Sequence, residues 1–376
     1  MKILIAGDFC PMDRVAKLIE KEDYGSVFGE VKEYTQQADF SIVNLEAPVV
    51  ETDAKPIEKC GPNLKCTSKA IKALKYAGFD MATLANNHFY DYGDDGVKQT
   101  LDACQKEGID VVGGGMNITD AAKIFYKEIK GVKVAIVNCC EHEFSIATEN
   151  SGGSNPLNPI QQYYAINEAK QNADKVILIV HGGHELYQLP SPRMKETYRF
   201  FVDAGADAVI NHHQHCYSGY EVYKDKPIFY GLGNFCFDRA TKRDSVWNKG
   251  YMVMLHFTNE IISFENIPYI QGNDKAGIYL LKDMKKFKLE IFNLNSIIAN
   301  DQQLKEKHIK WMDRTSEKYI IALEPYKGKL FTCLYSHNLV PKFINRNKAI
   351  VMLAYLRCEA HMERTLNALN KIKCQK

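Results

Sequence analysis

The feature that most constrains the fold is the run Lys175–Val180, which is almost wholly apolar and ends at His181. A run of this kind is typical of a central strand in a parallel sheet, because helices or a second sheet then cover both of its faces. Apolar strand patterns also begin near residues 2, 40, 81 and 206. Helical patterns separate these strands, and paired strands follow after about residue 235. This alternation predicts an α/β sandwich. The predicted helices cover residues 13–36 with their approaches, 68–78, 96–108, 161–172 and 192–204.

The character of the chain changes beyond residue 275. Lys-rich segments and helical patterns dominate there, with helices predicted over residues 301–322 and 346–373. A length of 376 residues predicts two domains, or one large domain with an extension. We therefore expect a first domain over residues 1–270 and a mostly helical C-terminal extension over residues 271–376, serving as a cap or an oligomerisation arm. The leucines of the last helix are interpreted as a core stripe beneath a solvated charged face.

The bulk properties exclude several classes of protein. A net charge of +2 gives no electrostatic case for a nucleic-acid partner. No apolar run approaches the roughly 20 residues of a transmembrane segment, and the N-terminal apolar run is too short for a signal peptide. The 11 cysteines include no CxxC pair, which is typical of free thiols in a reducing compartment. We therefore expect a cytoplasmic protein.

Polar residues that can bind metals follow the ends of successive predicted strands. In an open α/β sheet, sites gather at the carboxyl ends of the strands. Carboxylate, amide and imidazole side chains at those ends are the ligands of a two-metal hydrolytic centre, which needs a carboxylate that bridges the two cations. The alternative for the histidines is a His-rich surface loop without a ligand role. The residues concerned are Asp8, Glu46, Asn87, His88, His181, His212, His213 and His215.

An ordered set of short motifs carries a resemblance to a known family. The set runs along residues 1–270, and each of its motifs is weak by itself. It resembles the capsule and poly-γ-glutamate biosynthesis protein CapA family, a branch of the calcineurin-like metallophosphoesterases. The motifs are Gly7-Asp8, Asn44-Leu45-Glu46, Ala85-Asn86-Asn87-His88, His181-x-Gly183-x-Glu185, Gly205-Ala206-Asp207, His213-Gln214-His215 and Tyr230-Gly231-Leu232-Gly233-Asn234-Phe235.

The resemblance implies a four-layer α/β/β/α sandwich with a dinuclear metal site. By this analogy Asp8 binds the first metal, Glu46 bridges the two, and the Asn87 amide oxygen binds the second. His181 is then a ligand of the second metal, and the general acid is His88. The remaining histidines of the His-x-His pair, His213 and His215, divide between the two metals. Residues that contact the substrate or support the ligands are Cys10, Asn44, Glu185 and Asn234.

The chain departs from the superfamily pattern at two places. Cys10 stands where the superfamily has a histidine, and it is either a thiolate ligand that favours zinc or a small buried residue without a ligand role. Asn211 replaces a glycine that many relatives have before the final motif, so His212 could replace one of the two later imidazoles. Two divalent ions, of Mn, Fe or Zn, are expected, with one ion or none as the alternatives.

The reaction implied by the resemblance is phosphoester hydrolysis by a metal-bound hydroxide, assisted by His88 at the leaving group. The expected substrate is an anionic polymer or a phosphorylated small molecule, and an amide bond is an alternative target. A different class of function is a non-catalytic protein that assembles or binds a polymer and keeps a degenerate metal site. Cys10 favours this alternative, whereas the Asn87-His88 pair favours the enzyme.

Overall fold

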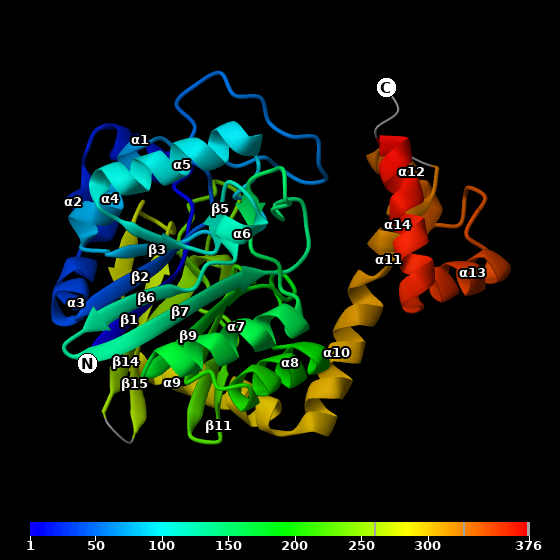
Figure 1. Ribbon diagram of the computed structural model, residues 1–376. Coiled ribbons are helices and arrows are strands. Elements are labelled where there is room, and N and C mark those ends of the chain that lie inside the picture. Colours follow the sequence, from blue (N-terminus) through cyan, green and yellow to red (C-terminus); the bar gives the residue numbers. More distant parts are fainter. Residues whose placement is uncertain (259–260, 326–327, 374–376) are drawn as a thin grey trace. The chain divides into compact units, whose positions relative to one another are not determined.

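The computed structural model describes residues 1–258, 261–325 and 328–373 (Figure 1). The chain divides into two compact units, Met1–Lys305 and Glu306–Lys376. The division falls within one helix, Asp301–Thr315.

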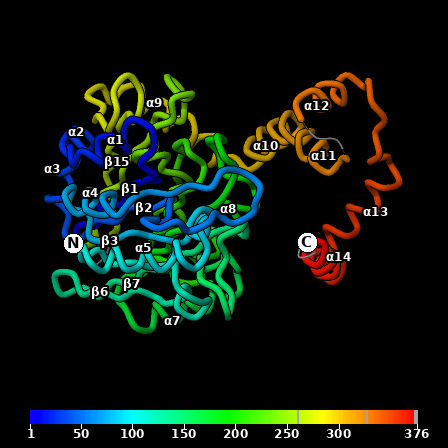
Figure 2. The backbone as a smooth tube through the Cα atoms, turned by 90° about the horizontal axis from the view of Figure 1, so that it is seen from above, coloured from blue at the N-terminus to red at the C-terminus, as the bar shows by residue number. Residues whose placement is uncertain are grey.

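The first sheet of the first unit has eight strands in the order β16-β15-β14-β1-β2-β3-β4, and β13 also pairs with β1. Strands β1 to β4 run parallel, whereas β14, β15 and β16 join β1 through antiparallel pairs. Figure 2 shows β1, β2 and β3 side by side. The strands are β1 Lys2–Phe9, β2 Phe40–Leu45, β3 Met81–Thr83, β4 Asp110–Val112, β13 Asn234–Cys236, β14 Lys249–Phe257, β15 Ile262–Gln271 and β16 Ile278–Leu280.

The second sheet has six strands in the order β11-β12-β10-β9-β7-β6. Its central strands β7, β9, β10 and β12 are parallel, and the apolar run that begins at Lys175 is β9, in the middle of them. The strands are β6 Phe125–Ile129, β7 Val132–Cys140, β9 Lys175–His181, β10 Ala208–His212, β11 Tyr220–Tyr223 and β12 Lys226–Phe229, with β5 Gly114–Gly115 and β8 Gly153–Ser154 forming a separate pair.

The two sheets pack face to face, with helices on both outer faces. Alternate side chains of β1 point to opposite faces of the first sheet: Ile3 and Ile5 pack against the second sheet, whereas Leu4 and Ala6 pack under helices. Helices α1 to α5 cover the first sheet, and α7 and α8 cover the second. This arrangement confirms the predicted four-layer α/β/β/α sandwich. The helices are α1 Asp13–Glu20, α2 Tyr24–Phe28, α3 Val31–Gln37, α4 Lys69–Ala77, α5 Gly93–Glu107, α6 Ile118–Ala121, α7 Pro159–Asn172 and α8 Pro192–Asp203, with a 3-10 turn at Val246–Asn248.

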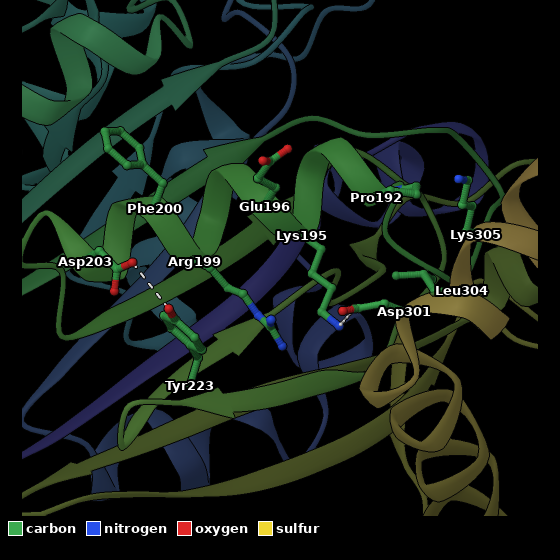
Figure 3. A pocket seen from close by; sticks show the side chains of 10 residues that line it. All are labelled: Pro192, Lys195, Glu196, Arg199, Phe200, Asp203, Tyr223, Asp301, Leu304 and Lys305. Atoms are coloured by element: carbon green, nitrogen blue, oxygen red, sulfur yellow. Dashed lines mark hydrogen bonds and ion pairs between the residues drawn. The ribbon is translucent and has the colours of Figure 1, made fainter.

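The first unit continues past residue 270, where the sequence placed the boundary, to Lys305. Strand β16 extends the first sheet, and Phe287 and Ile291 of α9 (Met284–Ala299) are buried in the core between the sheets. Lys195 of α8 donates a hydrogen bond to the Ile298 carbonyl oxygen at 2.5 Å. It also donates to Asp301 Oδ1 at 2.6 Å (Figure 3). A cavity of about 520 Å³ lies between α8 and the start of α10, and none of the candidate site residues lines it.

The second unit is helical, as predicted for the C-terminal extension. Helix α10 (Asp301–Thr315) leads into α11 Glu317–Leu323, α12 Lys329–Ser336, α13 Arg346–Arg357 and α14 Glu359–Lys373. Among its described residues, Ile321, Glu324 and Tyr335 are buried, which is a very small core. Of the helices described, none combines the length and the apolar character needed to cross a membrane.

Candidate metal centre

The candidate ligands lie at the carboxyl ends of parallel strands from both sheets. Asp8 is near the end of β1, and Glu46 directly follows β2. Asn87 and His88 follow β3 after three residues. In the second sheet, His181 ends β9 and His212 ends β10, with the two strands in register at these residues. The parallel topology therefore brings residues that are far apart in the sequence to one edge of the sandwich.

Two groups of three buried side chains could each hold a metal ion. The first group is Asp8, Glu46 and His215, and the second is Glu46, His181 and His213. Within each group the ligand atoms lie within 4.8 Å of one another. Glu46 belongs to both groups: its Oε1 lies 3.6 Å from His215 Nε2 and 3.8 Å from His181 Nε2. A carboxylate shared in this way occupies the position of a bridging ligand.

The two carboxyl groups of the cluster, Asp8 and Glu46, are buried with too few hydrogen bonds to stabilise their negative charge. Burial raises the pKa of Asp8 to about 7, against hydrogen bonds from Asn44 and the His213 backbone that lower it. Burial, and then the charge of Asp8, raise the pKa of Glu46 well above its usual value. Both oxygens of Glu46 are buried and accept no hydrogen bond from a described residue. Orphaned carboxylate oxygens of this kind are costly unless a cation pairs with them, so the donor set fits a divalent metal.

Two of the imidazoles, those of His181 and His215, are held in the neutral form that binds metals. Burial lowers the pKa of His181 well below its usual value, and the neighbouring His213 lowers it further. Burial also lowers the pKa of His215 strongly. A neutral imidazole keeps a free lone pair on one ring nitrogen for a metal ion. The cluster thus combines buried carboxylates that need positive charge with two rings, His181 and His215, that supply none.

Three heteroatoms converge on one point at His181. Its Nε2 lies 3.0 Å from Asn87 Oδ1 and 3.1 Å from His213 Nδ1. The Asn87 amide nitrogen donates to Glu143 Oε2 at 3.2 Å, which turns the amide oxygen toward His181. Because one ring proton can satisfy only one of these acceptors, the arrangement suits a cation that all three atoms contact. Sequence reasoning missed Glu143, although it follows the end of β7 after two residues.

Asparagine side chains orient the ligands of the first group. Asn44 donates to Asp8 Oδ1 at 2.7 Å, and Thr83 in turn donates to Asn44 Oδ1 at 3.2 Å. The Asn234 amide nitrogen donates to two backbone carbonyls, so its Oδ1, 2.9 Å from His215 Nδ1, is the acceptor. His215 therefore carries its proton on Nδ1 and presents the Nε2 lone pair toward Glu46. Such partners fix the ring orientation of a metal ligand.

The backbone of the final motif is strained. His213 has φ of 88° and His215 has φ of 54°, and residues other than glycine rarely adopt this left-handed region. The His213 amide donates to Asp8 Oδ2 at 3.3 Å. Strain of this kind persists where the surrounding structure enforces it, and it concentrates at functional sites. Here the strained backbone directs the imidazoles of both His213 and His215 into the same cluster.

His88 has its own buried partners beside the cluster. Its Nδ1 lies 2.7 Å from Asp91 Oδ2, which also accepts a hydrogen bond from the Leu64 amide at 2.6 Å. Lys59 pairs with Asp91 and places its Nζ 3.2 Å from His88 Nδ1, with the Lys59 side chain only 2% exposed. The sequence reading missed both partners. Asp91 lies three residues after His88 in a turn and was detectable by that spacing. Nothing in the sequence of the polar loop around Lys59 distinguishes that lysine.

Three further predicted site residues neither belong to the two ligand groups nor make a described hydrogen bond to a member of them. Cys10 is fully buried in the core under the helices, and burial raises the pKa of its thiol well above the usual value. His212 Nδ1 is 3.6 Å from Asp8 Oδ1, but neither ring nitrogen has a hydrogen-bond partner among the described residues. Burial lowers the pKa of His212 to about 3. Glu185 is exposed and makes no hydrogen bond to His181 in the described structure.

The range matched by a family model includes every candidate site residue. The family model "Bacterial capsule synthesis protein PGA_cap" matches residues 2–239. Capsule biosynthesis protein CapA of Bacillus anthracis is 36% identical over 251 residues, which are 65% of this chain and 61% of that protein. PGA biosynthesis protein CapA of Bacillus subtilis (strain 168) is 34% identical over 241 residues, 63% of each chain. The chain thus spans about three-fifths of the length of these curated relatives.

Two solved structures show a more distant similarity. A hypothetical protein from Thermus thermophilus aligns with a TM-score of 0.46 and 15% identity, over 74% of this chain and 99% of that one. The 5'-nucleotidase precursor from the same organism aligns with a TM-score of 0.42 and 9% identity, over 81% of this chain and 58% of that one.

Proposed function

The chain belongs to the family of bacterial capsule synthesis proteins PGA_cap, and from this premise we propose that it is a metal-dependent hydrolase of phosphoesters. The observation that carries the proposal is the pair of buried ligand groups that share Glu46. A buried carboxylate with two unpartnered oxygens has no structural use of its own, since an apolar residue would fill the same space at lower cost.

The ligand assignment follows from the two groups. Asp8, Glu46 and His215 hold one ion, and Glu46, His181 and His213 hold the other with the Asn87 amide oxygen. Nitrogen and oxygen ligands in this mixture suit Mn, Fe or Zn. Two such ions supply an activated water molecule and neutralise charge on a phosphoryl group. Cys10 and His212 are left out of the assignment because neither belongs to the two groups.

His88 supplies the proton that the leaving oxygen needs. Asp91 holds the Nδ1 side of its ring, so Nε2 is the nitrogen available to the leaving oxygen, and it donates a proton when both ring nitrogens carry one. Asp91 is itself buried and pairs with Lys59, which fixes this carboxylate beside the His88 ring. A positioned general acid of this kind contributes about 10²–10⁴-fold to the rate.

The substrate class is inferred from the family. The two CapA relatives are named for capsule and PGA biosynthesis, so the substrate proposed here is an anionic polymer or a phosphorylated small molecule from such a process. The ten cysteines within the described residues form no disulfide, and we propose a cytoplasmic location on that basis.

The function is tested by reconstitution. The full chain, stripped of metal and then supplied with Mn, Fe or Zn, is expected to hydrolyse p-nitrophenyl phosphomonoesters or phosphodiesters, which the stripped chain does not. Release of p-nitrophenol measures the rate. Full metal occupancy with no turnover on either ester class would contradict the proposal.

Metal affinity is expected to fall as the pH is lowered. Asp8 has a pKa of about 7, raised from 3.8, so below neutral pH a metal ion must displace its proton. Affinity should therefore fall about tenfold per pH unit for each proton displaced. The folding stability of the metal-free protein changes with pH in the opposite direction. Between about pH 4 and pH 7 the folded state binds one more proton than the unfolded state, so raising the pH through this window lowers the free energy of unfolding. Competition with a chelator at pH 6 and pH 8 measures the first effect, and equal affinities at both pH values would contradict it.

A second candidate function is a non-catalytic protein that binds or assembles an anionic polymer. The observation that favours it is Cys10, which is buried where the superfamily pattern has a histidine and removes one ligand from the first group. In that case the metal would hold the loops together, and His88→Ala would change no measurable rate.

A further inference from the structure

The segment 325–358 of the second unit, called here the basic apolar segment, has an unusual charge pattern. It contains six Lys and Arg residues and no Asp or Glu. It lies in a C-terminal unit, residues 306–376, whose formal net charge is +8, whereas the net charge of the whole chain is +2. A charge asymmetry of this size between the two parts of a chain is typical of contact with an anionic surface.

The same segment exposes large apolar side chains. Leu330 and Leu339 are each 69% exposed, and Leu356 is 63% exposed. Helix α13 contains eight consecutive apolar residues, 349–356, and none of its residues is buried. A soluble surface rarely exposes apolar groups in such a continuous patch unless another surface covers them. The large apolar side chains that the segment exposes are Leu330, Phe331, Leu339, Phe343, Ile350, Val351, Leu353, Tyr355 and Leu356.

Basic residues border the apolar run of α13 on both sides. Arg346 and Lys348 precede it, and Arg357 follows it. The helix has 12 residues and is therefore about 18 Å long, short of the roughly 30 Å of a bilayer core. Apolar side chains of a short helix can enter the membrane interface while the flanking cations meet anionic headgroups. We propose that the basic apolar segment binds the surface of a membrane that contains anionic lipids.

Charge argues against self-association through this segment. In a symmetric dimer it would face a copy of itself, which has the same sign of charge and no acidic residue to pair with. Anionic lipid headgroups complement the cations, and the acyl region covers the leucines. The proposal does not depend on the hydrolase activity, and it concerns residues outside the matched range 2–239.

Vesicle co-sedimentation of the full chain tests the proposal. Vesicles of equal parts phosphatidylglycerol and phosphatidylcholine are expected to bind the protein at least tenfold more tightly than vesicles of phosphatidylcholine alone, with the difference lost at high salt. The charge variant Lys348→Glu/Arg357→Glu should weaken binding about 25-fold or more, since each basic residue near the surface contributes about fivefold. The apolar variant Leu353→Ser/Leu356→Ser should weaken binding as well.

Matched controls keep the test specific. Lys98→Glu/Lys123→Glu makes the same charge change at exposed lysines of the first unit and should leave vesicle binding unchanged. Equal binding to both kinds of vesicle, or an equal loss in both charge variants, would overturn the proposal. An absence of binding to anionic vesicles at low salt would overturn it too, and a monomer–dimer equilibrium weakened by Leu353→Ser/Leu356→Ser would then assign the surface to a second copy.

Discussion

The substitution His88→Ala is expected to lower kcat for phosphoester hydrolysis by about 10²–10⁴-fold while the protein keeps its metal. The side chain is held by Asp91 and lies outside both ligand groups, so its loss removes a proton donor without opening the metal site. Steady-state kinetics on a p-nitrophenyl ester measures the rate, and elemental analysis of the same sample measures the metal.

A matched control is available on β14. His256→Ala removes a partly exposed histidine that pairs with Lys2, at the opposite end of β1 from Asp8. It should leave both rate and metal content unchanged. If His88→Ala kept full turnover, His88 would have no role as an acid. If it lost metal in proportion to activity, the residue would be a ligand instead.

The substitution Gly7→Ala is expected to have the largest effect on stability. A Cβ at residue 7 would lie 1.9 Å from the carbonyl oxygen of Gly233 and 3.3 Å from the amide nitrogen of Phe235. Both are backbone atoms of the segment that pairs with β1, so the strand must separate from β13. Overpacking of this kind costs about 3 kcal/mol or more when backbone cannot yield. The midpoint of chemical unfolding should fall, and metal binding should weaken because Asp8 is the next residue.

Gly25→Ala is the control for Gly7→Ala. Gly25 lies in helix α2, and a Cβ there would meet only the Tyr76 hydroxyl at 3.7 Å, an ordinary contact. Alanine also favours the helix, so stability should stay the same or rise slightly. Equal stability of Gly7→Ala and the wild type would show that β1 and β13 do not approach as closely as described.

Much of the site could be predicted from the sequence because parallel strands end at a common edge. Asp8, Glu46 and His181 each follow an apolar strand pattern, and that position alone predicts that they meet. The choice between His212 and His213 could not be predicted, since it depends on the left-handed backbone of His213. Lys59 could not be predicted either, because a loop conformation buries it.

The fold shows the same division between local pattern and tertiary context. The apolar period over residues 13–36 predicts a helix, but the structure has three short ones there. Glu22 with φ of 59° and Gly29 with φ of 49° interrupt them, and a helical period does not reveal such turns. The first unit extends beyond residue 270 because α9 buries Phe287 and Ile291 between the sheets, a contact that the helical pattern of the segment does not show.

Metal content is the measurement that tests the central claim most directly. Elemental analysis of the full chain, purified without a His tag or chelator, is expected to find close to two equivalents of Mn, Fe or Zn. Glu46→Ala should lose most of both ions, because Glu46 is the one residue common to the two groups. One equivalent in the wild type would leave a mononuclear site. No metal in the wild type after reconstitution, or full metal content in Glu46→Ala, would contradict the account.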